Sequence, residues 1–241
     1  MSPDRFEEDG LMLVDKPVGW TSFDVVSKLR GGLRQVTGRK VKVGHAGTLD
    51  PLASGLLVLA YGKRTKELPG LTGLDKVYQC TLALGHTTPS YDAETEPIAH
   101  GPWEHLTQAH VEEVLTAFRG EIQQRPPVFS AKHHKGERAY FLAREGVEVE
   151  MPFQSVRVDR LELTSFLPGQ LELAVACGKG TYIRSLAHDI GQALGCGAYL
   201  SALRRTHIGP FSVDDARDPH TWSQWFHELM VHRSGDGLTA L

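Results

Sequence analysis

The chain has 241 residues, of which 41% are hydrophobic, and carries a net charge of −3 at pH 7. This is enough apolar sequence for a large core in one or two domains, and no apolar run reaches the roughly 20 residues that a membrane-spanning helix needs. The N-terminal residues are acidic and lack a signal-peptide core, so we expect a cytoplasmic protein with no membrane attachment.

The cysteines are few and widely spaced: Cys80, Cys177 and Cys196. An odd number of cysteines at such spacing predicts neither a disulfide framework nor a metal knuckle. We expect them to be small buried side chains in a reducing compartment.

The charge is unevenly distributed along the chain. Residues 1–10 and residues 211–241 each carry a net charge of −3, which leaves +3 on residues 11–210. Basic side chains cluster at Arg30/Arg34/Arg39/Lys40/Lys42, at Lys63/Arg64/Lys66, at Lys132/Lys135/Arg138 and at Arg204/Arg205. Each cluster is compatible with contact to nucleic-acid phosphates or with a solvated surface.

In chain order, the first predicted elements are a strand over 11–14 and a helix that starts at Ser22, a plausible N-cap. Between them, Lys16 reads from the residues alone as an ordinary turn lysine. Gly38 follows the last turn of the helix. One face of the helix is apolar and comprises Val25, Val26, Leu29, Leu33 and Val36.

Residues 43–57 hold a single carboxylate, Asp50, among small and apolar residues. Pro51 stiffens the turn that carries it, and the neighbouring glycines leave room for a flat ring. We expect the side chains of Leu49, Leu52 and Leu56 to line this space and exclude water from it. Such a carboxylate suits attack on an electron-poor carbon or stabilisation of positive charge. The alternative is a tight loop between two strands, in which Asp50 bonds its own turn.

Strands are predicted over 41–43, 56–60 and 76–84, and in the last of these Tyr78 falls on the apolar face. From the residues alone Tyr78 is a core aromatic. A helix is predicted from about 107 to 119.

Paired prolines then precede a basic, histidine-rich loop that contains Lys132, His133, His134 and Lys135. The adjacent histidines are a weak candidate for a metal site.

Further on, the pattern predicts a helix over 137–145, strands near 147–151, 156–163 and 171–177, and a helix opened by Thr181 as N-cap. Arg184 falls at the third position of this helix, where the macrodipole disfavours a cation. Its side chain therefore either reaches solvent or holds an anion, for which the chain offers Asp50. A last amphipathic helix carries Trp222, Trp225 and Phe226.

Six ordered motifs, over roughly residues 11–215, resemble the TruB family of pseudouridine synthases, which modify the T-loop of tRNA. They are Asp15-Lys16-Pro17-x-Gly, the segment from Val43 to Leu57, the strand with Tyr78, the segment from Pro126 to Gly136, Thr181-Tyr182-Ile183-Arg184 and the segment from Tyr199 to Phe211. The resemblance implies an α+β pseudouridine synthase fold: a long mixed, mainly antiparallel sheet with flanking helices. It also implies a catalytic domain over 1–210 with an inserted RNA-closing loop at about 121–150. Residues 211–241 are expected to be a short helix and tail, too short for the PUA-type RNA-binding domain of many relatives.

The implied reaction is isomerisation of uridine to pseudouridine at position 55 in the T-loop of tRNA, with no external cofactor or metal. The implied partner is the T-stem-loop, bound by a monomer that needs no obligate protein partner. The target uridine must leave its stack to reach Asp50. Whether Asp50 adds covalently, removes a sugar proton or stabilises a cationic sugar stays open.

The resemblance also assigns roles to residues. Asp50 is the catalytic carboxylate, Arg184 pairs with it, and Tyr78 lies against the base as a candidate for the late proton transfer. The RNA-binding set is Lys16 and Pro17, which also support the loop, together with His45, Asp92, Lys132, His133, Leu200, Arg204 and Arg205. His45 either stacks against RNA or bonds backbone in its turn, and Arg204 and Arg205 are either RNA contacts or surface charge.

Two segments depart from the family pattern. Where the family reads Thr-Asp-Thr-x-Asp-x-x-Gly, this chain keeps Asp92 but has Pro89 and Thr95. The lysine of the closing loop is replaced by His133, which would make that contact sensitive to pH.

Two other functions stay open. One is a tRNA-binding protein that helps RNA to refold. The other is a metal-dependent nuclease that uses His45, Asp50 and Asp92, although no two of these residues sit at ligand spacing on one element.

Overall fold

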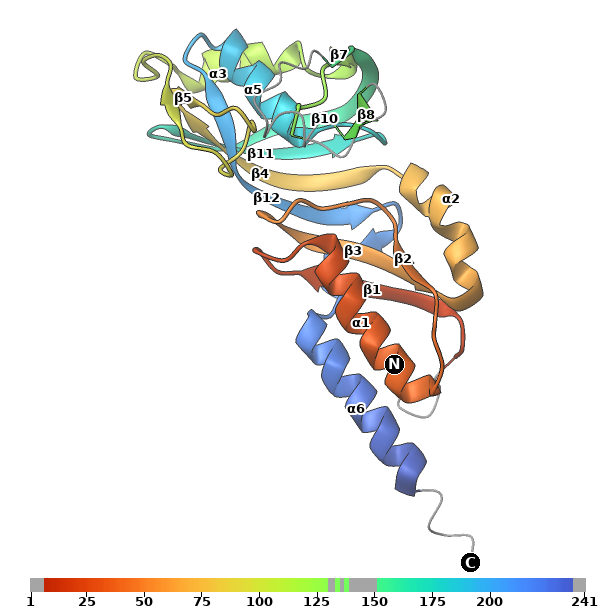
Figure 1. The fold of residues 1–241 in the computed structure, drawn as a ribbon. Helices are drawn as coiled ribbons and strands as arrows, with labels where there is room; N and C mark the ends of the chain where they lie inside the picture. Colours follow the sequence, from red (N-terminus) through yellow and green to blue (C-terminus); the bar gives the residue numbers. More distant parts are fainter. Residues whose placement is uncertain (1–6, 130–132, 135–136, 139–150, 236–241) are drawn as a thin grey trace, which may run out of the picture. The chain divides into compact units, whose positions relative to one another are not determined.

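A computed structural model describes residues 7–129, 133–134, 137–138 and 151–235 (Figure 1). The chain divides into two compact units. The first unit comprises Met1–Leu74 and Arg204–Leu241, and the second comprises Asp75–Leu203. Strand β12 (Ala198–Ile208) begins in the second unit and ends in the first.

The sheet of the first unit is built on β3 (Ala53–Tyr61). Strand β1 (Gly10–Lys16) pairs with β3 in antiparallel fashion over its whole length, and β2 (Val43–His45) pairs with the end of β3. The last part of β12 follows β3 in the strand order and forms a hairpin with β13 (Phe211–Ser212). Short helical segments complete this unit: η1 (Gly62–Glu67), α2 (Leu68–Gly73) and η2 (Val213–Asp215).

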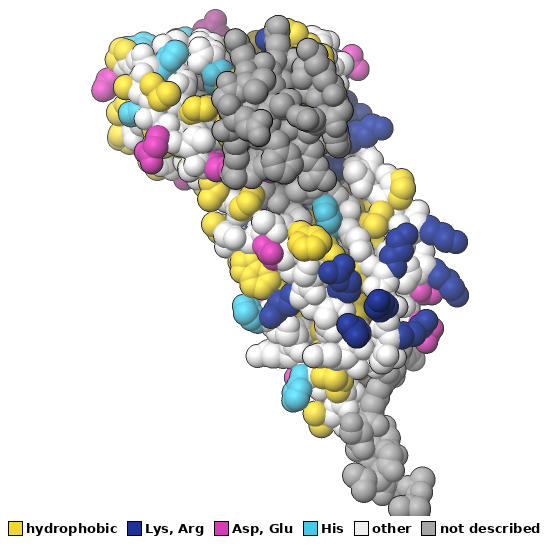
Figure 2. Space-filling model, viewed as in Figure 1, with side chains coloured by type: hydrophobic (Ala, Val, Ile, Leu, Met, Phe, Trp, Pro, Cys, Tyr) yellow, Lys and Arg dark blue, Asp and Glu magenta, His cyan; other side chains and the backbone are white. Residues whose placement is uncertain are grey.

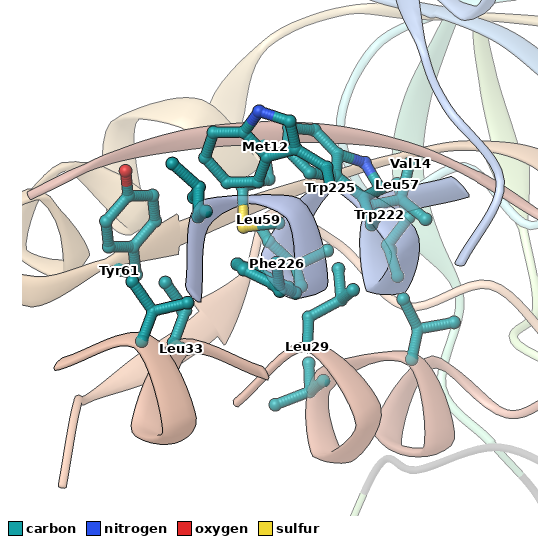
Figure 3. Close-up of a cluster of buried hydrophobic side chains, with 14 residues drawn as sticks. Met12, Val14, Leu29, Leu33, Leu57, Leu59, Tyr61, Trp222, Trp225 and Phe226 are labelled. Carbon is teal, nitrogen blue, oxygen red and sulfur yellow. The ribbon is translucent and has the colours of Figure 1, made fainter. Parts of the chain in front are cut away.

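Helices α1 (Ser22–Thr37) and α6 (Pro219–Gly235) pack on one face of this sheet (Figures 1 and 3). The cluster that they bury with β1 and β3 contains Met12, Val14, Val25, Val26, Leu29, Leu33, Val36, Leu57, Leu59, Tyr61, Trp222, Trp225, Phe226 and Leu229. On the other face of β3, Leu56 and Val58 pack with Ala46 and Ile208. Because successive strand residues point to opposite faces, β3 is buried on both sides, which explains its continuous apolar run.

The start of α1 differs from the prediction by one residue. Thr21 is the N-cap: its hydroxyl accepts from the Asp24 N–H (3.0 Å), and its own N–H donates to the Asp24 carboxylate (2.8 Å). This capping box leaves the neighbouring Ser22 free for another contact. The end is as predicted, with Gly38 in the left-handed region at φ 68°.

In the second unit the strand order is β12-β4-β11-β10-β7. The bounds are Lys76–Leu84 for β4, Gln170–Cys177 for β11, Gln154–Leu167 for β10 and Gly120–Gln124 for β7. Neighbouring strands from β4 to β7 are antiparallel. Helix α3 (Gln108–Thr116) contacts β10 and α5 (Ile183–Ala193). Two small hairpins are formed by β5 (His86–Thr87) with β6 (Ile98–Ala99) and by β8 (His133–His134) with β9 (Glu137–Arg138).

Several predicted elements need correction here. The helix predicted from 137 begins instead as β9, because Glu137 and Arg138 pair with β8; its remainder lies outside the described residues, as does most of the strand predicted near 147–151. Helix α5 has Tyr182 rather than Thr181 as its N-cap, so Arg184 occupies its second position rather than its third. As predicted, Cys80, Cys177 and Cys196 are free and buried. No helix in the described part of the chain is long and apolar enough to cross a membrane.

Candidate active site

The loop that carries Asp50 lies between β2 and β3 in the first unit and is tied down on both sides. The Ser22 hydroxyl accepts from the Leu49 N–H (2.9 Å) and donates to the Leu49 carbonyl (3.0 Å). The Gly19 N–H donates to the Pro51 carbonyl (2.8 Å). Asp50 itself is half-buried. The turn before α1 therefore holds the residues on either side of the carboxylate.

Two of the three predicted apolar walls of this loop are buried. Leu49 is 3% exposed and Leu56 is fully buried. Leu52 is 39% exposed, so residues of the first unit do not shield its side chain from water.

Lys16 is a fully buried cation beneath this loop. Its ammonium donates to the carbonyls of Trp20 (2.6 Å), Pro17 (3.0 Å) and Pro51 (3.4 Å). Burial lowers the pKa of Lys16 to about 8; the Asp50 carboxylate opposes this shift, whereas Arg205 adds to it. Lys16 thus joins the turn after β1 to the turn that carries Asp50, and Asp50 lies within its electrostatic reach.

Arg205, near the end of β12, is a second buried cation at the same loop. Its guanidinium donates to the carbonyls of Leu56 (2.8 Å), Gly47 (3.1 Å) and Thr48 (3.4 Å). It is 1% exposed. This burial argues against a direct contact between Arg205 and RNA, and its observed contacts fix the two flanks of the Asp50 loop.

Gly55 allows β3 to lie close to β12, the strand that carries Arg205. A Cβ at Gly55, whose φ is 103°, would lie 2.2 Å from the backbone oxygen of Arg205. Only glycine fits here, because the conformation is left-handed and the obstructing atom is backbone.

Arg204, next to Arg205, points to the other face of β12. Its guanidinium makes two hydrogen bonds to Asp15, at 2.8 and 3.0 Å, and one to the Ser54 hydroxyl at 3.4 Å. The pair is partly exposed, with 38% of the Arg204 side chain and 31% of the Asp15 side chain accessible. Its contact with RNA stays a prediction.

His45 ends β2 and is half-buried. Burial lowers the pKa of His45; a backbone hydrogen bond with Gly47 opposes this effect and Arg205 adds to it. Burial thus favours the neutral form of the His45 imidazole. Within the described residues its buried Nδ1 has no hydrogen-bond partner. The backbone hydrogen bond with Gly47 agrees with the role of bonding backbone in the turn, and stacking against RNA stays a prediction.

The second unit contains four of the predicted site residues: Tyr78, Arg184, Asp92 and Leu200. Tyr78 lies in β4 opposite Val175 of β11 and is 8% exposed, on the same buried face as Cys80, Leu82 and Leu84. The predicted alternation of this strand is therefore confirmed.

Arg184 is buried at the start of α5. Its Nη1 lies 3.6 Å from the Asp92 carboxylate and donates to the Ser90 carbonyl at 3.3 Å. The sequence motifs indicated an anionic partner for Arg184 but not Asp92. Asp50 lies in the first unit and Arg184 in the second, and the pairing of these two side chains stays a prediction.

The loop around Asp92 is internally bonded despite its departure from the family pattern. The Asp92 carboxylate accepts from the Glu94 N–H (2.9 Å), and its carbonyl accepts from the Thr88 hydroxyl (2.7 Å). Thr95, where the family has glycine, bonds the Ser90 hydroxyl at 2.8 Å. The Leu200 N–H donates to the Tyr91 carbonyl (3.0 Å), which ties β12 to the loop. The threonine that replaces the family's glycine therefore stabilises the loop through a hydrogen bond to Ser90.

Sequence reasoning assigned no role to Tyr91 of this loop or to His188 and Asp189 of α5. Tyr91 has φ 63°, unusual for a side chain other than glycine, and stacks on His188 with ring centroids 3.9 Å apart. Burial raises the pKa of the neighbouring Asp189 to about 6. No motif pointed to them, because Tyr91 and the His188-Asp189 pair meet only after folding.

Two predicted residues fall in the closing loop. Lys132 lies outside the described residues. The backbone of His133 lies in β8 opposite Arg138, and the structure does not describe the side chain of His133.

The comparisons with known proteins cover almost the whole chain. Residues 34–183 match the family model described as TruB family pseudouridylate synthase (N terminal domain). The chain belongs to the TruB family. Residues 184–233 match the model of the tRNA pseudouridylate synthase B C-terminal domain. Two curated relatives are named tRNA pseudouridine synthase B. The one from Phocaeicola vulgatus is 45% identical over 94% of this chain and 97% of its own length. The one from Parabacteroides distasonis is 47% identical over 92% and 94%.

Solved structures support the same fold. A chain in a Cbf5-Nop10-Gar1 complex matches with a TM-score of 0.66 and 31% identity over 89% of this chain. A chain in an H/ACA RNP bound to a substrate RNA containing 2'-deoxyuridine matches with a TM-score of 0.68 and 27% identity over 99%. This chain spans 55% and 60% of those two chains. The predicted α+β pseudouridine synthase fold is therefore confirmed.

Proposed function

We propose that Asp50 is the catalytic carboxylate with which this TruB-family enzyme isomerises uridine to pseudouridine at position 55 in the T-loop of tRNA. The enzyme breaks the bond between the sugar carbon and N1 of uracil and forms a bond from the same carbon to C5. C5 loses its proton and N1 gains one, so atoms and charge balance without an external reagent.

The observation that carries the proposal is the construction of the Asp50 loop. The loop is held by the buried ammonium of Lys16 and the buried guanidinium of Arg205, both through main-chain carbonyls. A carboxylate on so fixed a turn keeps its position while the uracil detaches and turns, which is the main requirement of a reaction at a single sugar carbon.

We assign the remaining roles on the family resemblance. Arg184 would hold the Asp50 carboxylate. The resemblance gives Asp92 an RNA contact, and the structure adds a second role for it, because its carboxylate lies 3.6 Å from the Arg184 guanidinium. Tyr78 would lie against the base and assist the loss of the C5 proton. His45 would stack against the RNA as the uridine leaves its stack in the T-loop.

The test replaces Asp50 by Asn, which keeps the shape and removes the charge. Tritium release from tRNA containing 5-tritiated uridine should disappear, because it requires the bond to C5, while tRNA affinity should stay within a few-fold of the wild type. Asp214→Asn, on an exposed acid of the same unit, is the matched control and should keep its activity. Persistent release in the Asp50 variant would contradict the assignment.

We also propose that the enzyme acts as a cytoplasmic monomer without an obligate protein partner. Sedimentation of the active protein with and without tRNA tests this. A purified chain that forms pseudouridine only when a second protein is added would contradict it.

A further inference from the structure

The structure brings together two basic clusters that are separated by more than 20 residues in the sequence. One cluster comprises Arg30 and Arg34 of α1 with Arg39, Lys40 and Lys42 of the segment before β2, and the other comprises Lys63, Arg64 and Lys66 of η1. The Gly62 N–H donates to the Lys42 carbonyl (2.9 Å), which joins the two segments. Figure 2 shows Lys and Arg side chains gathered over α1, β2 and the segment that follows β3. We call these eight residues the α1–η1 basic surface.

Part of this charge is compensated within the protein. Arg39 pairs with Glu8 (2.7 Å), Arg64 with Glu67 (2.8 Å) and, more loosely, Lys63 with Asp9 (4.0 Å). Five exposed members have no carboxylate within 4.0 Å among the described residues: Arg30, Arg34, Lys40, Lys42 and Lys66. Arg30 also lies over the Phe23 ring, 5.9 Å from its centroid, which leaves its charge uncompensated. Solvent-exposed cations that lack a carboxylate partner are free to meet an external anion.

The other basic clusters of the sequence do not offer such a surface in the described residues. Arg204 is paired with Asp15, and Arg205 is buried on carbonyls. Lys132 and Lys135 of the remaining cluster lie outside the described residues. Among the clusters that the structure describes, the α1–η1 basic surface is therefore the one with exposed, uncompensated charge, whereas the sequence pattern did not distinguish between the clusters.

We propose that the α1–η1 basic surface binds the phosphate backbone of tRNA outside the catalytic centre. The inference rests on the proposed function, which makes a polyanion the substrate. The chain carries a net charge of −3, so its overall field does not attract tRNA, and a local positive surface has to supply attraction and orientation. Flexible lysine and arginine side chains without a built pocket suit phosphate contacts, which position RNA without reading its bases.

The test substitutes Lys40, Lys42 and Lys66 by Gln in one variant and by Arg in a second. All three are exposed, so neither variant should alter folding. With Gln, the KM for tRNA at 0.1 M salt should rise about tenfold, and the slope of log affinity against log salt should shrink by about 2, because fewer counterions are released. The kcat at saturating tRNA should not change. The Arg variant keeps the charges and should behave as the wild type.

Arg160→Gln removes one exposed positive charge from β10 in the second unit and measures the effect of losing a single charge outside the α1–η1 basic surface. An unchanged KM and salt slope in the Gln variant would overturn the proposal, as would an equal loss in the Arg variant. So would weaker binding to phosphatidylglycerol vesicles with unaltered tRNA binding, because the surface would then recognise a membrane.

Binding and turnover also separate this inference from the proposed function. A wild-type protein that releases no tritium contradicts the proposed reaction. If its salt-dependent tRNA binding is nevertheless weakened in the Gln variant, the surface remains supported.

Discussion

At the scale of single residues, the loop that carries Asp50 depends on two buried cations that have different chemistry. Lys16 can lose its proton and Arg205 cannot, and both contact main-chain carbonyls rather than a carboxylate. Carbonyls fix the path of the backbone, whichever side chains it carries. A substitution at either cation should therefore affect the geometry of Asp50 before it affects RNA binding.

Arg205→Lys tests this for the guanidinium. Arg205 reaches the carbonyls of Leu56, Thr48 and Gly47 with three separate nitrogens, Nε, Nη1 and Nη2. The donors of an ammonium all lie on one nitrogen and cannot span these positions, so the free energy of unfolding should fall by about 2–3 kcal/mol. The kcat should fall at least about tenfold, while the Kd for tRNA should not change. Arg204→Lys is the matched control on the neighbouring residue: its partly exposed pair with Asp15 contributes at most about 1 kcal/mol. A weakened Kd with normal kcat in Arg205→Lys would instead favour an RNA contact.

For Lys16 the expected signature is a dependence of stability on pH. The folded pKa of about 8 lies below the ordinary value of 10.5, so between these values the unfolded chain holds a proton that the folded chain has released. The contribution of Lys16 to stability therefore rises as pH increases from about 8 to about 10.5, by at most about 3 kcal/mol. Urea unfolding of wild type and Lys16→Met at pH 7 and pH 9.5 measures this. A difference between the two proteins that does not change with pH would contradict it.

The individual site residues were predictable to the extent that they lie in continuous motifs. Asp50 stands out because proline, glycine and strand signals surround it within a few positions. Lys16 reads as a turn lysine from the residues alone, and only the family resemblance indicated its role. The partner Asp92 of Arg184 and the three-carbonyl contact of Arg205 were not predictable, because they join segments about 90 to 160 residues apart. The sequence around a cation does not indicate which of many distant carboxylates or carbonyls it will contact in the folded protein.

At the scale of elements, the packing of α1 against α6 gives neighbouring glycines opposite roles. A Cβ on Gly32 would lie 2.1 Å from the Phe226 ring, whereas a Cβ on Gly31 would meet nothing within 4 Å. Both residues lie in the interior of α1, where glycine costs about 1 kcal/mol relative to alanine.

Gly31→Ala should therefore stabilise the protein by about 0.5–1 kcal/mol. Gly32→Ala should destabilise it by roughly 1–3 kcal/mol, because overpacking against a buried ring outweighs the gain in helix propensity. Denaturant unfolding of the two variants provides the comparison. Equal effects would mean that α6 does not rest on this face of α1.

Elements were predictable where burial alternates cleanly. Strand β4 has the predicted bounds, and the apolar stripe of α1 is the predicted one. Strand β12 was not predicted as an element, because arginine, threonine and histidine occupy most of its last five positions and hide the period of two. Those polar side chains are compatible with a strand here because Arg205 finds carbonyl acceptors and Arg204 finds Asp15.

At the scale of the whole molecule, the chain forms two compact units, and the predicted catalytic domain over 1–210 stays a prediction. The first unit is completed by the C-terminal residues: Phe226 and the tryptophans of α6 fill the core between α1 and β3 (Figure 3). This packing was only partly predictable from the sequence. The apolar side chains of the last helix indicate that it packs against another element, but they do not indicate which element. The C-terminal helix is thus a structural part of the unit that carries Asp50, although it is remote from Asp50 in sequence.

Local stability should reflect this division. Phe226→Ala removes a 2% exposed ring from the core of the first unit and should cost roughly 3–5 kcal/mol. Native-state hydrogen exchange should then show lost protection in β1, β3 and α1, with protection in β4, β10 and β11 retained. Leu173→Ala, at a 1% exposed position in β11, is the reciprocal variant and should show the reverse pattern. Loss of protection throughout the chain in both variants would mean that the two units unfold together, because β12, which is shared between them, couples their stabilities.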